Sequence, residues 1–299
     1  MRRRDFVALS GYALLVPHAP ALLARDGSFP ARLTQDIAQI ERRVGGRLGV
    51  AVYDATTGRQ PGHRMRERFP LCSTFKLLLA AQVLSRAERG QERLSRMVPY
   101  GQSDLLEYAP VTRARVAEGG MTVSALIEAA LEYSDNTAAN LLLATVGGPE
   151  GLTGYLRSIG DDATRLDRIE PALNSAEPGD VRDTTTPDAM IADLRRILLG
   201  PTLTAAGRER LLAWLQANTT GARALRAGMP ADWRLGDKTG SGGHGATNDV
   251  GMAWPPGRPP VLVAAYLAET RADATERYAA LAGVGRAVGD WIAAGAPRR

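Results

Sequence analysis

The chain has 299 residues, of which 44% are hydrophobic, and a formal net charge of +5. Its length exceeds that of most single domains, so we expect one large domain or two interleaved ones with ample apolar material for a core. The sequence pI of 9.6 could indicate a nucleic-acid partner. However, acidic and basic residues are interspersed, without a long basic run or interleaved aromatic residues, which argues against nucleic-acid binding.

Residues 1–27 are typical of an export signal. They start with arginines, continue through an apolar stretch and reach small residues around Ala19–Ala21. Arg3 and Arg4, followed shortly by a hydrophobic pair, fit the twin-arginine pattern, and the alternative is a basic terminus joined to a surface helix. The apolar stretch is interrupted by Pro17 and Pro20 and is too short to span a bilayer. We therefore expect an exported, periplasmic protein whose mature form has no membrane span.

Cysteine and histidine are scarce. The single cysteine, Cys72, excludes an internal disulfide and a cysteine-based metal site. With three histidines, one of them in the leader, a zinc site or a Ser-His-Asp triad is poorly supported. We therefore expect neither a metal nor a cofactor.

Hydrophobic periodicity predicts the elements in chain order. A helix over 30–44 precedes a strand in RLGVAVYDATTG; near the C-terminus, strands in NDVGMAWPP and PVLVAAYLAE flank the turn PPGRPP, and a helix covers 273–295. The middle is mostly helical, with helices predicted over 73–89, 122–131, 135–146, 151–158, 187–199 and 204–216.

This order predicts a two-domain α/β fold. Residues 28–67 and 217–299 would form an α/β domain, and residues 68–216 would form an inserted all-helical domain. Sites for small molecules often lie at domain junctions, so we expect a cleft there.

Lysine is rare in this chain. Of its 37 basic residues only Lys76 and Lys238 are lysines. Lys76 follows Ser73 by three residues at the start of a predicted helix, so the two side chains share a helix face. The first helical turn favours negative charge on the serine oxygen, and a buried lysine, unlike an arginine, can release its proton. The pair indicates an activated serine, although alone it fits equally a capped helix with a surface lysine.

The second lysine lies in GDKTGSGG, a strand-like segment. Glycines in a strand indicate close approach by another backbone or a ligand, and Ser241 could direct its N–H toward that ligand. A third group, Ser134-Asp135-Asn136, precedes a predicted helix, where Ser134 or Asp135 alone could be a plain N-cap.

A fourth group lies in residues 165–183, which are polar, rich in proline and without periodicity. These features predict a compact omega loop. The loop carries Glu170, followed by Pro171, and then Asn174.

Together these four groups resemble the motifs of the class A serine β-lactamases. The matching residues are Ser73-Thr74-Phe75-Lys76, Ser134-Asp135-Asn136, Glu170-Pro171-Ala172-Leu173-Asn174 and Lys238-Thr239-Gly240, in the family's order and spacing. The resemblance covers about residues 28–295. It implies an antiparallel sheet flanked by helices plus the inserted helical domain. It also implies a monomer that hydrolyses the β-lactam amide of penicillins and cephalosporins through a serine acyl-enzyme, and so confers antibiotic resistance.

The resemblance further implies catalytic roles. Ser73 is the nucleophile, and either Lys76 or Glu170 activates it. Ser134 relays a proton to the leaving lactam nitrogen. Glu170, with Asn174, holds the catalytic water that hydrolyses the acyl-enzyme.

Binding roles follow from the same resemblance. Asn136 contacts the side-chain amide of the substrate, and Lys238, Thr239 and Gly240 belong to the strand that binds its carboxylate. The N–H groups of Ser73 and Ser241 form the oxyanion hole.

Further residues expected around the cleft lie outside these motifs. Tyr108 matches a family position at the cleft mouth, or it is a half-buried surface tyrosine. Arg168 and Asp183 are expected to form an ion pair that closes the omega loop. Arg226 and Arg277 are both candidates for the arginine that assists carboxylate binding.

Some features narrow the subfamily. Gly242 stands where the disulfide-linked carbapenemase branch has a second cysteine, whereas Ser241, Thr247 and the NTTG…RAG segment resemble the cefotaxime-hydrolysing branch. We therefore expect activity on penicillins and cephalosporins rather than carbapenems. His244 is expected at the rim of the site.

Two alternatives share most of these motifs. A D-alanyl-D-alanine peptidase has the serine, lysine, asparagine and Lys-Thr-Gly groups, but the Glu170–Asn174 loop argues against it. A β-lactam sensor domain should carry transmembrane helices and lack a working glutamate.

Overall fold

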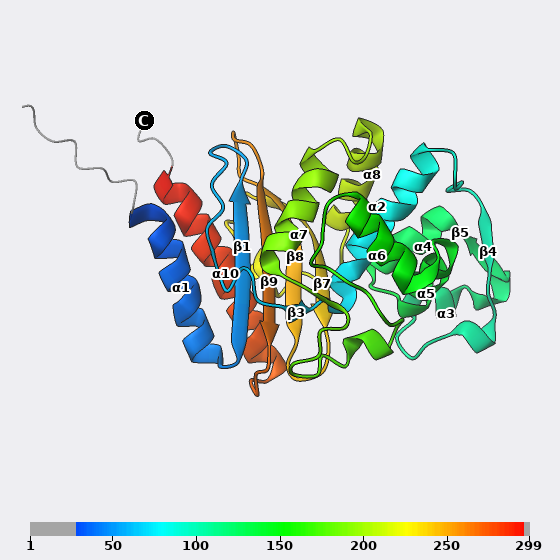
Figure 1. Cartoon of the computed structure of the whole chain (residues 1–299), viewed down its shortest axis with the longest axis horizontal. Coiled ribbons are helices and arrows are strands. Elements are labelled where there is room, and N and C mark those ends of the chain that lie inside the picture. Colours follow the sequence, from blue (N-terminus) through cyan, green and yellow to red (C-terminus); the bar gives the residue numbers. More distant parts are fainter. Residues whose placement is uncertain (1–27, 296–299) are drawn as a thin grey trace, which may run out of the picture.

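The structure, a computed structural model, describes residues 28–295 (Figure 1). The predicted export signal lies outside the described residues. The principal elements are α1 (Ser28–Val44), β1 (Arg47–Asp54), α2 (Phe75–Glu88), α4 (Val123–Glu132), α5 (Asn136–Thr145), α6 (Gly148–Ser158), α7 (Pro187–Leu194), α8 (Ala205–Gln216), β7 (Arg234–Ser241), β8 (Thr247–Trp254), β9 (Val261–Ala268) and α10 (Ala274–Gly295). Shorter ones are β2 (Gly62–His63), β3 (Phe69–Pro70), β4 (Met97–Pro99), α3 (Pro110–Ala114), β5 (Gly120–Thr122), β6 (Thr184–Thr185) and α9 (Leu225–Gly228).

A five-stranded sheet joins the two ends of the described chain. Its strand order is β2-β1-β9-β8-β7, and every neighbouring pair is antiparallel. Strand β1 pairs with β9 along its whole length, from Arg47 opposite Ala268 to Asp54 opposite Val261. The antiparallel sheet expected from the family resemblance is therefore confirmed, with β7 at one edge.

The side chains of β9 show why this strand is apolar throughout. Val261, Val263, Ala265 and Leu267 pack into a core with α1 and α10. The alternate residues, Leu262, Ala264, Tyr266 and Ala268, pack into the other core, with the helices from the middle of the chain. Successive residues of a strand point to opposite faces, so a sheet covered on both faces needs apolar residues at every position. Figure 1 shows the two helical layers on either side of the sheet.

Helix α2 is the centre of the helical part. All of its residues from Phe75 to Ser85 are buried. A helix that is apolar around its whole circumference must be covered on all sides, and α4, α5, α6 and α8 contact α2. Because α2 is enclosed, the residues at its start are held within the protein interior.

Most predicted long elements are confirmed, with differences at their ends. The helix expected over 73–89 divides into a 3₁₀ turn, Cys72–Thr74, and α2. The segment Arg195–Leu199, predicted as the end of one helix, is π-helical. The helix expected over 151–158 begins earlier, at Gly148. The proposed domain limits at 67/68 and 216/217 stay a prediction. Within residues 28–295 there is no helix of sufficient length and hydropathy to cross a membrane.

Candidate functional site

Ser73 lies in the 3₁₀ turn that leads into α2, where backbone contacts fix its place. The side chain of Asn248 on β8 donates to the carbonyl oxygen of Leu71 at 3.1 Å. Gly240 on β7 packs against the same turn: a Cβ at this position would lie 3.2 Å from the Ser73 nitrogen and 3.1 Å from the Leu71 oxygen. A glycine in the Lys-Thr-Gly triplet therefore lets the edge strand approach the serine closely.

The amine of Lys76 is buried among polar groups of three residues. Its Nζ lies 3.0 Å from Glu170 Oε1, and it donates to the Ser134 carbonyl oxygen at 2.8 Å and to Asn136 Oδ1 at 2.6 Å. The Ser73 hydroxyl donates to Glu170 Oε1 at 3.4 Å. Across the described part of the chain no hydrogen bond joins Lys76 to Ser73, so Glu170 is the group that contacts both.

Burial perturbs both lysines. Loss of solvent lowers the pKa of Lys76, although the nearby Glu170 carboxylate opposes that shift. Burial, and then the charge of Lys76, lowers the pKa of Lys238 to about 7. Lys238 Nζ donates to Ser134 Oγ at 3.0 Å and to the Thr239 carbonyl oxygen at 2.9 Å, and Lys76 Nζ is 3.4 Å from Ser134 Oγ. The Ser134 hydroxyl thus lies between two amines that can change protonation state.

Glu170 is held from two directions. The Asn174 side chain donates to Glu170 Oε2, and the peptide bond between Glu170 and Pro171 is cis. Asn140 on α5 brackets the Glu170 backbone, accepting from its N–H at 3.0 Å and donating to its carbonyl oxygen at 2.9 Å. Sequence analysis did not identify Asn140. The available signal was its position four residues after Asn136, which places both on one helix face.

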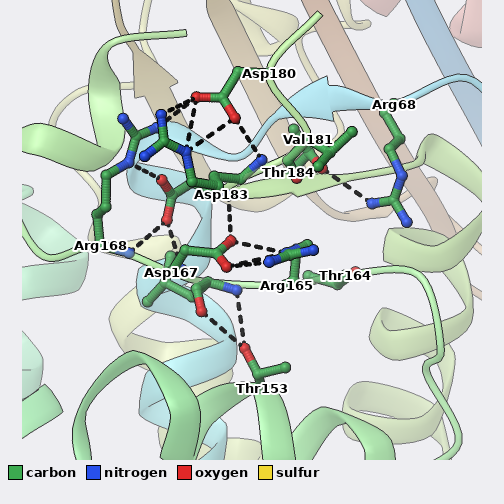
Figure 2. A network of polar contacts seen from close by, with 12 residues as sticks. Arg68, Thr153, Thr164, Arg165, Asp167, Arg168, Asp180, Val181, Asp183 and Thr184 are labelled. Carbon is green, nitrogen blue, oxygen red and sulfur yellow. Dashed lines mark hydrogen bonds and ion pairs between the residues drawn. The ribbon is translucent and has the colours of Figure 1, made fainter.

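The two ends of the omega loop are tied together by a pair of aspartates (Figure 2). The predicted ion pair is confirmed, with Arg168 Nε 2.5 Å from Asp183 Oδ2. Asp183 Oδ1 also accepts from the N–H groups of Asp167 and Arg168 at 2.7 and 2.9 Å. Asp167 Oδ2 in turn accepts from the Asp183 N–H at 3.0 Å and pairs with Arg165. Each aspartate therefore binds the backbone of the opposite chain segment.

The edge of β7 presents hydroxyl groups beside Lys238. The hydroxyls of Thr239 and Thr220 are hydrogen-bonded to each other. Ser241 ends the strand and is exposed. Thr220 was not identified from the sequence, because nothing in its local pattern indicates contact with β7.

The structure separates the two candidate arginines. Arg226 donates to the backbone carbonyl oxygens of Trp233 and Leu235, at 3.3 and 2.6 Å. Arg277 instead donates to Thr247 Oγ1 at 2.9 Å, and Thr247 is the residue paired with Ser241 across the β7–β8 ladder. Arg277 is thus the arginine nearer the end of β7 that carries the Lys-Thr-Gly triplet.

Two other predicted residues lie at the surface. Tyr108 is 51% exposed, its carbonyl oxygen accepts from the Asn136 N–H at 3.1 Å, and its hydroxyl donates to the Tyr133 carbonyl oxygen at 3.3 Å. His244 lies on the β7–β8 turn, where its Nε2 is 2.9 Å from Glu177 Oε2 of the omega loop. Both residues are thus at the surface; for Tyr108 this fits either interpretation, and its place at the cleft mouth stays a prediction.

The site combines the groups that acyl transfer requires. A serine hydroxyl contacts a buried carboxylate, and two amines with lowered pKa values flank a second hydroxyl. Such an arrangement can activate a nucleophile on one side and protonate a leaving group on the other.

Comparison with known proteins identifies the family. A sequence model described as "Beta-lactamase enzyme family" matches residues 32–292. The chain belongs to this family. It is 49% identical over 296 residues to β-lactamase L2 of Stenotrophomonas maltophilia, covering 96% of this chain and 97% of that protein. It is 47% identical over 256 residues to β-lactamase CTX-M-8 of Citrobacter amalonaticus, covering 86% and 88%.

Solved structures agree and specify class A. An ancestral class A β-lactamase superposes with a TM-score of 0.85 at 59% identity, covering 86% of this chain and 99% of that one. A protein described as the putative class A β-lactamase PenP from Rhodopseudomonas palustris has a TM-score of 0.85 at 52% identity, covering 86% and 98%. Class A enzymes are hydrolases that open β-lactams through a serine acyl-enzyme, and the chain is a member of this class.

Cys72, the residue before the nucleophile, lies against Gly242. Its thiol is buried beside the nucleophile, and burial raises the pKa of that thiol. A Cβ on Gly242 would lie 2.7 Å from Cys72 Sγ, so the glycine that replaces a cysteine here is in contact with the thiol. Within the described residues Cys72 is thus a buried packing residue beside the nucleophile.

Proposed function

We propose that this protein hydrolyses penicillins and cephalosporins with Ser73 as its nucleophile and Glu170 as its deacylating base. The observation that carries the proposal is the position of the Glu170 carboxylate, which is 1% exposed and contacts both Ser73 Oγ and Lys76 Nζ. A carboxylate in this place can hold a water beside the acyl-enzyme ester and take its proton, with Asn174 as the second partner of that water.

The reaction then proceeds in two halves. Ser73 Oγ attacks the lactam carbonyl, its proton passes to Lys76 or Glu170, and the C–N bond breaks as Ser134 protonates the nitrogen. Water, deprotonated by Glu170, then attacks the ester and releases Ser73. The N–H groups of Ser73 and Ser241 stabilise the oxyanion, a contribution of about 3–4 kcal/mol to the barrier.

Substrate recognition uses the edge of β7. Lys238 and Thr239 bind the carboxylate, with Arg277 as the assisting arginine because it contacts Thr247, the residue opposite Ser241 in the β7–β8 register. Asn136 contacts the side-chain amide of the substrate, and Tyr108 covers the mouth of the cleft.

A turnover assay tests the proposal. A chromogenic cephalosporin should be hydrolysed for many cycles per enzyme molecule. A single stoichiometric burst, followed by a stable covalent adduct, would instead identify a penicillin-binding peptidase or a sensor domain, because both acylate without efficient deacylation.

The same proposal includes export. Residues 1–27 act as a twin-arginine signal, and the mature enzyme works as a periplasmic monomer. Replacing Arg3 and Arg4 together by lysine should leave active enzyme in the cytoplasm, and unchanged export of that variant would refute this route.

A further inference from the structure

Two buried aspartates lie directly behind the proposed carboxylate subsite. Asp237 precedes Lys238 on β7, and Asp249 on β8 stands opposite Thr239 in the strand register. The two are 3% and 0% exposed, and their carboxyl groups are hydrogen-bonded to each other. Neither residue belongs to the machinery proposed above.

This pair must contain a proton. Carboxylates only accept hydrogen bonds, so two carboxyl groups bonded to each other share at least one hydrogen. The other partners are donors: Asn218 Nδ2 reaches Asp237 Oδ2 at 2.9 Å, and the Leu225 N–H reaches Asp249 Oδ2 at 3.0 Å. Asp249 Oδ1 has no donor among the described residues. Burial raises the pKa of both carboxyl groups, and the charge of Asp237 raises that of Asp249 further.

The cations near the two aspartates favour one negative charge on the pair. Lys238 and Arg226 favour the ionised form of Asp237. Arg226 is committed to the carbonyl oxygens of Leu235 and Trp233, which leaves Lys238 as the cation on β7 beside the pair. Two adjacent buried carboxylates do not both ionise, so the pair holds one proton and one charge.

A directed chain of hydrogen bonds connects the pair with Thr239. Because Asn218 Nδ2 donates to Asp237, its Oδ1 faces Thr220 and accepts from the Thr220 N–H and hydroxyl at 2.9 and 2.7 Å. The Thr220 hydroxyl hydrogen is thereby used, so its oxygen accepts from Thr239 in the bond between the two hydroxyls. In this arrangement Asp237, through Asn218 and Thr220, holds the Thr239 hydroxyl hydrogen on Thr220, and the hydroxyl turns from Thr220 when it donates to a substrate carboxylate.

We propose that Asp237 and Asp249 are positioning residues of the carboxylate subsite, sharing one proton so that a single negative charge keeps Lys238 cationic while Asn218 and Thr220 hold the Thr239 hydroxyl in place until a substrate carboxylate binds. This inference rests on the proposed function, because it assigns the charge that Lys238 offers to the substrate carboxylate. Besides this pair, Lys76 and Glu170 are the charged groups that act on Lys238, Lys76 lowering its pKa and Glu170 raising it.

Asparagine substitutions test the charge of the pair. In Asp249→Asn, the new amide donates to Asp237 and its oxygen accepts from Leu225, so the pair keeps one charge; Asp237→Asn keeps one charge on Asp249. The Asp237→Asn/Asp249→Asn double variant retains the shape and loses the charge. We expect Lys238 to titrate as in the wild type in both single variants, and on the order of one pH unit lower in the double variant.

The titration can be read directly. Lys76 and Lys238 are the only lysines in the chain, so a protein labelled with ¹⁵N-lysine gives two Nζ signals to follow with pH. A shift in either single variant half as large as that of the double variant would mean two charges and refute the shared proton. No shift in the double variant would refute the positioning role. Neither result depends on turnover, so failure of the proposed function is detected separately by the cephalosporin assay.

Kinetics supply the second readout. In the double variant Lys238 should lose its charge at a lower pH. We therefore expect kcat/KM at alkaline pH to fall about ten-fold, mainly because KM rises rather than because kcat falls. Asp193→Asn is the matched control, because Asp193 is a second buried carboxyl, paired with Asp161, that is not among the charges acting on Lys238. If the alkaline side of the pH profile of kcat/KM moves as much in Asp193→Asn as in the double variant, the assignment of the charge to Asp237 and Asp249 is wrong.

Discussion

At the residue scale, the choice between lysine and arginine is informative. The chain has 37 basic residues, and its two lysines both lie in the site, each fully buried. A guanidinium stays charged in any protein environment, whereas burial moves the pKa of an amine toward neutrality. At these two positions the chain thus has a cation that is able to lose its proton, an ability that the proposed function uses at Lys76.

Replacing Lys76 by arginine should remove this ability. We expect Lys76→Arg to lower kcat about 100- to 10,000-fold, because proton transfer beside Ser73 and Ser134 is lost. Lys238→Arg is the matched control, since Lys238 is proposed to act through its charge and should retain much more activity. Steady-state kinetics with thermal melts, to exclude misfolding, make the comparison; equal losses in the two variants would contradict the proton-transfer role.

Removing Glu170 should separate the two halves of the reaction. In Glu170→Ala we expect a penicillin adduct of the intact protein to accumulate, because acylation can proceed through Lys76 while the water loses its base. Mass spectrometry after mixing with penicillin detects the adduct. Wild-type turnover without an adduct would show that another group activates the water.

The sequence predicted the site residues whose chemistry is specific, but not those that position them. Ser73, Lys76, Ser134, Glu170 and Lys238 belong to short motifs, and the structure brings all five together. The residues that position them could not be predicted, because their roles follow only from contacts formed in the folded chain. Asn218 and Thr220 lie in the NTTG segment, which indicated a subfamily but no contact, and Asn140 and Asn248 belong to none of the motifs.

At the element scale, the omega loop depends on its closed ends. Asp183 is 1% exposed and binds both a guanidinium and two backbone N–H groups, which replaces the water that its carboxylate loses. Reciprocal contacts with Asp167 tie the two segments at one place. The position of Glu170 relative to Ser73 is therefore expected to depend on an ion pair that touches neither residue.

Weakening this closure should affect deacylation first. We expect Asp183→Asn to lower the free energy of unfolding by about 1–3 kcal/mol, because the buried carboxylate that binds Arg168 and two backbone N–H groups is lost and Arg168 keeps only its longer contact with Asp180, at 3.5 Å. The rate of deacylation should fall more than that of acylation, as measured by single-turnover and steady-state kinetics. Arg182→Gln is the control, since Arg182 is exposed and forms its ion pair with Asp180 rather than with Asp183; equal effects on both rates would contradict a role in placing Glu170.

Long elements were predictable and short ones were not. Helices α4, α5 and α8 follow from periodicity and caps, and Asp135 caps α5 by accepting from the Ala138 N–H at 2.9 Å. The 3₁₀ turn before α2 was not predicted. The φ of +44° at Cys72 occurs in a segment that packs against strand β7, which is distant in the sequence, so no local pattern indicates it. Likewise, β3 pairs with β6 over two residues each, too short for any local pattern to indicate.

At the scale of the whole molecule, the site lies where the sheet meets the helical layer. Ser73 begins the enclosed helix α2, whereas Lys238 and Gly240 belong to the edge strand β7, and the two segments contact directly. Sequence analysis predicted a cleft between an α/β part and a helical part. The register that brings Gly240 to Ser73 could not be predicted, because it depends on β7 pairing with β8 rather than on either segment alone.

The second buried carboxyl pair makes the stability of the whole molecule depend on pH. Asp193 is fully buried against Asp161, and burial together with the Asp161 charge raises the pKa of Asp193 well above 3.8. The folded protein therefore keeps a proton that the unfolded chain releases. The stabilisation is complete below pH 3.8 and is lost as pH rises through the folded pKa, by at most about 1.4 kcal/mol per pH unit.

Removing this carboxyl should flatten the dependence. In Asp193→Asn the amide can donate to Asp161 Oδ2, which has no donor among the residues the structure describes. We expect the variant to gain stability relative to the wild type steadily as pH rises, measured by urea denaturation at several values between about pH 5 and about pH 9. Asp180→Asn is the control, because the neighbouring Arg182 lowers the pKa of Asp180 to about 2 and its carboxylate stays ionised throughout this range. A difference between Asp193→Asn and wild type that stays constant with pH would mean that Asp193 is ionised in the folded protein.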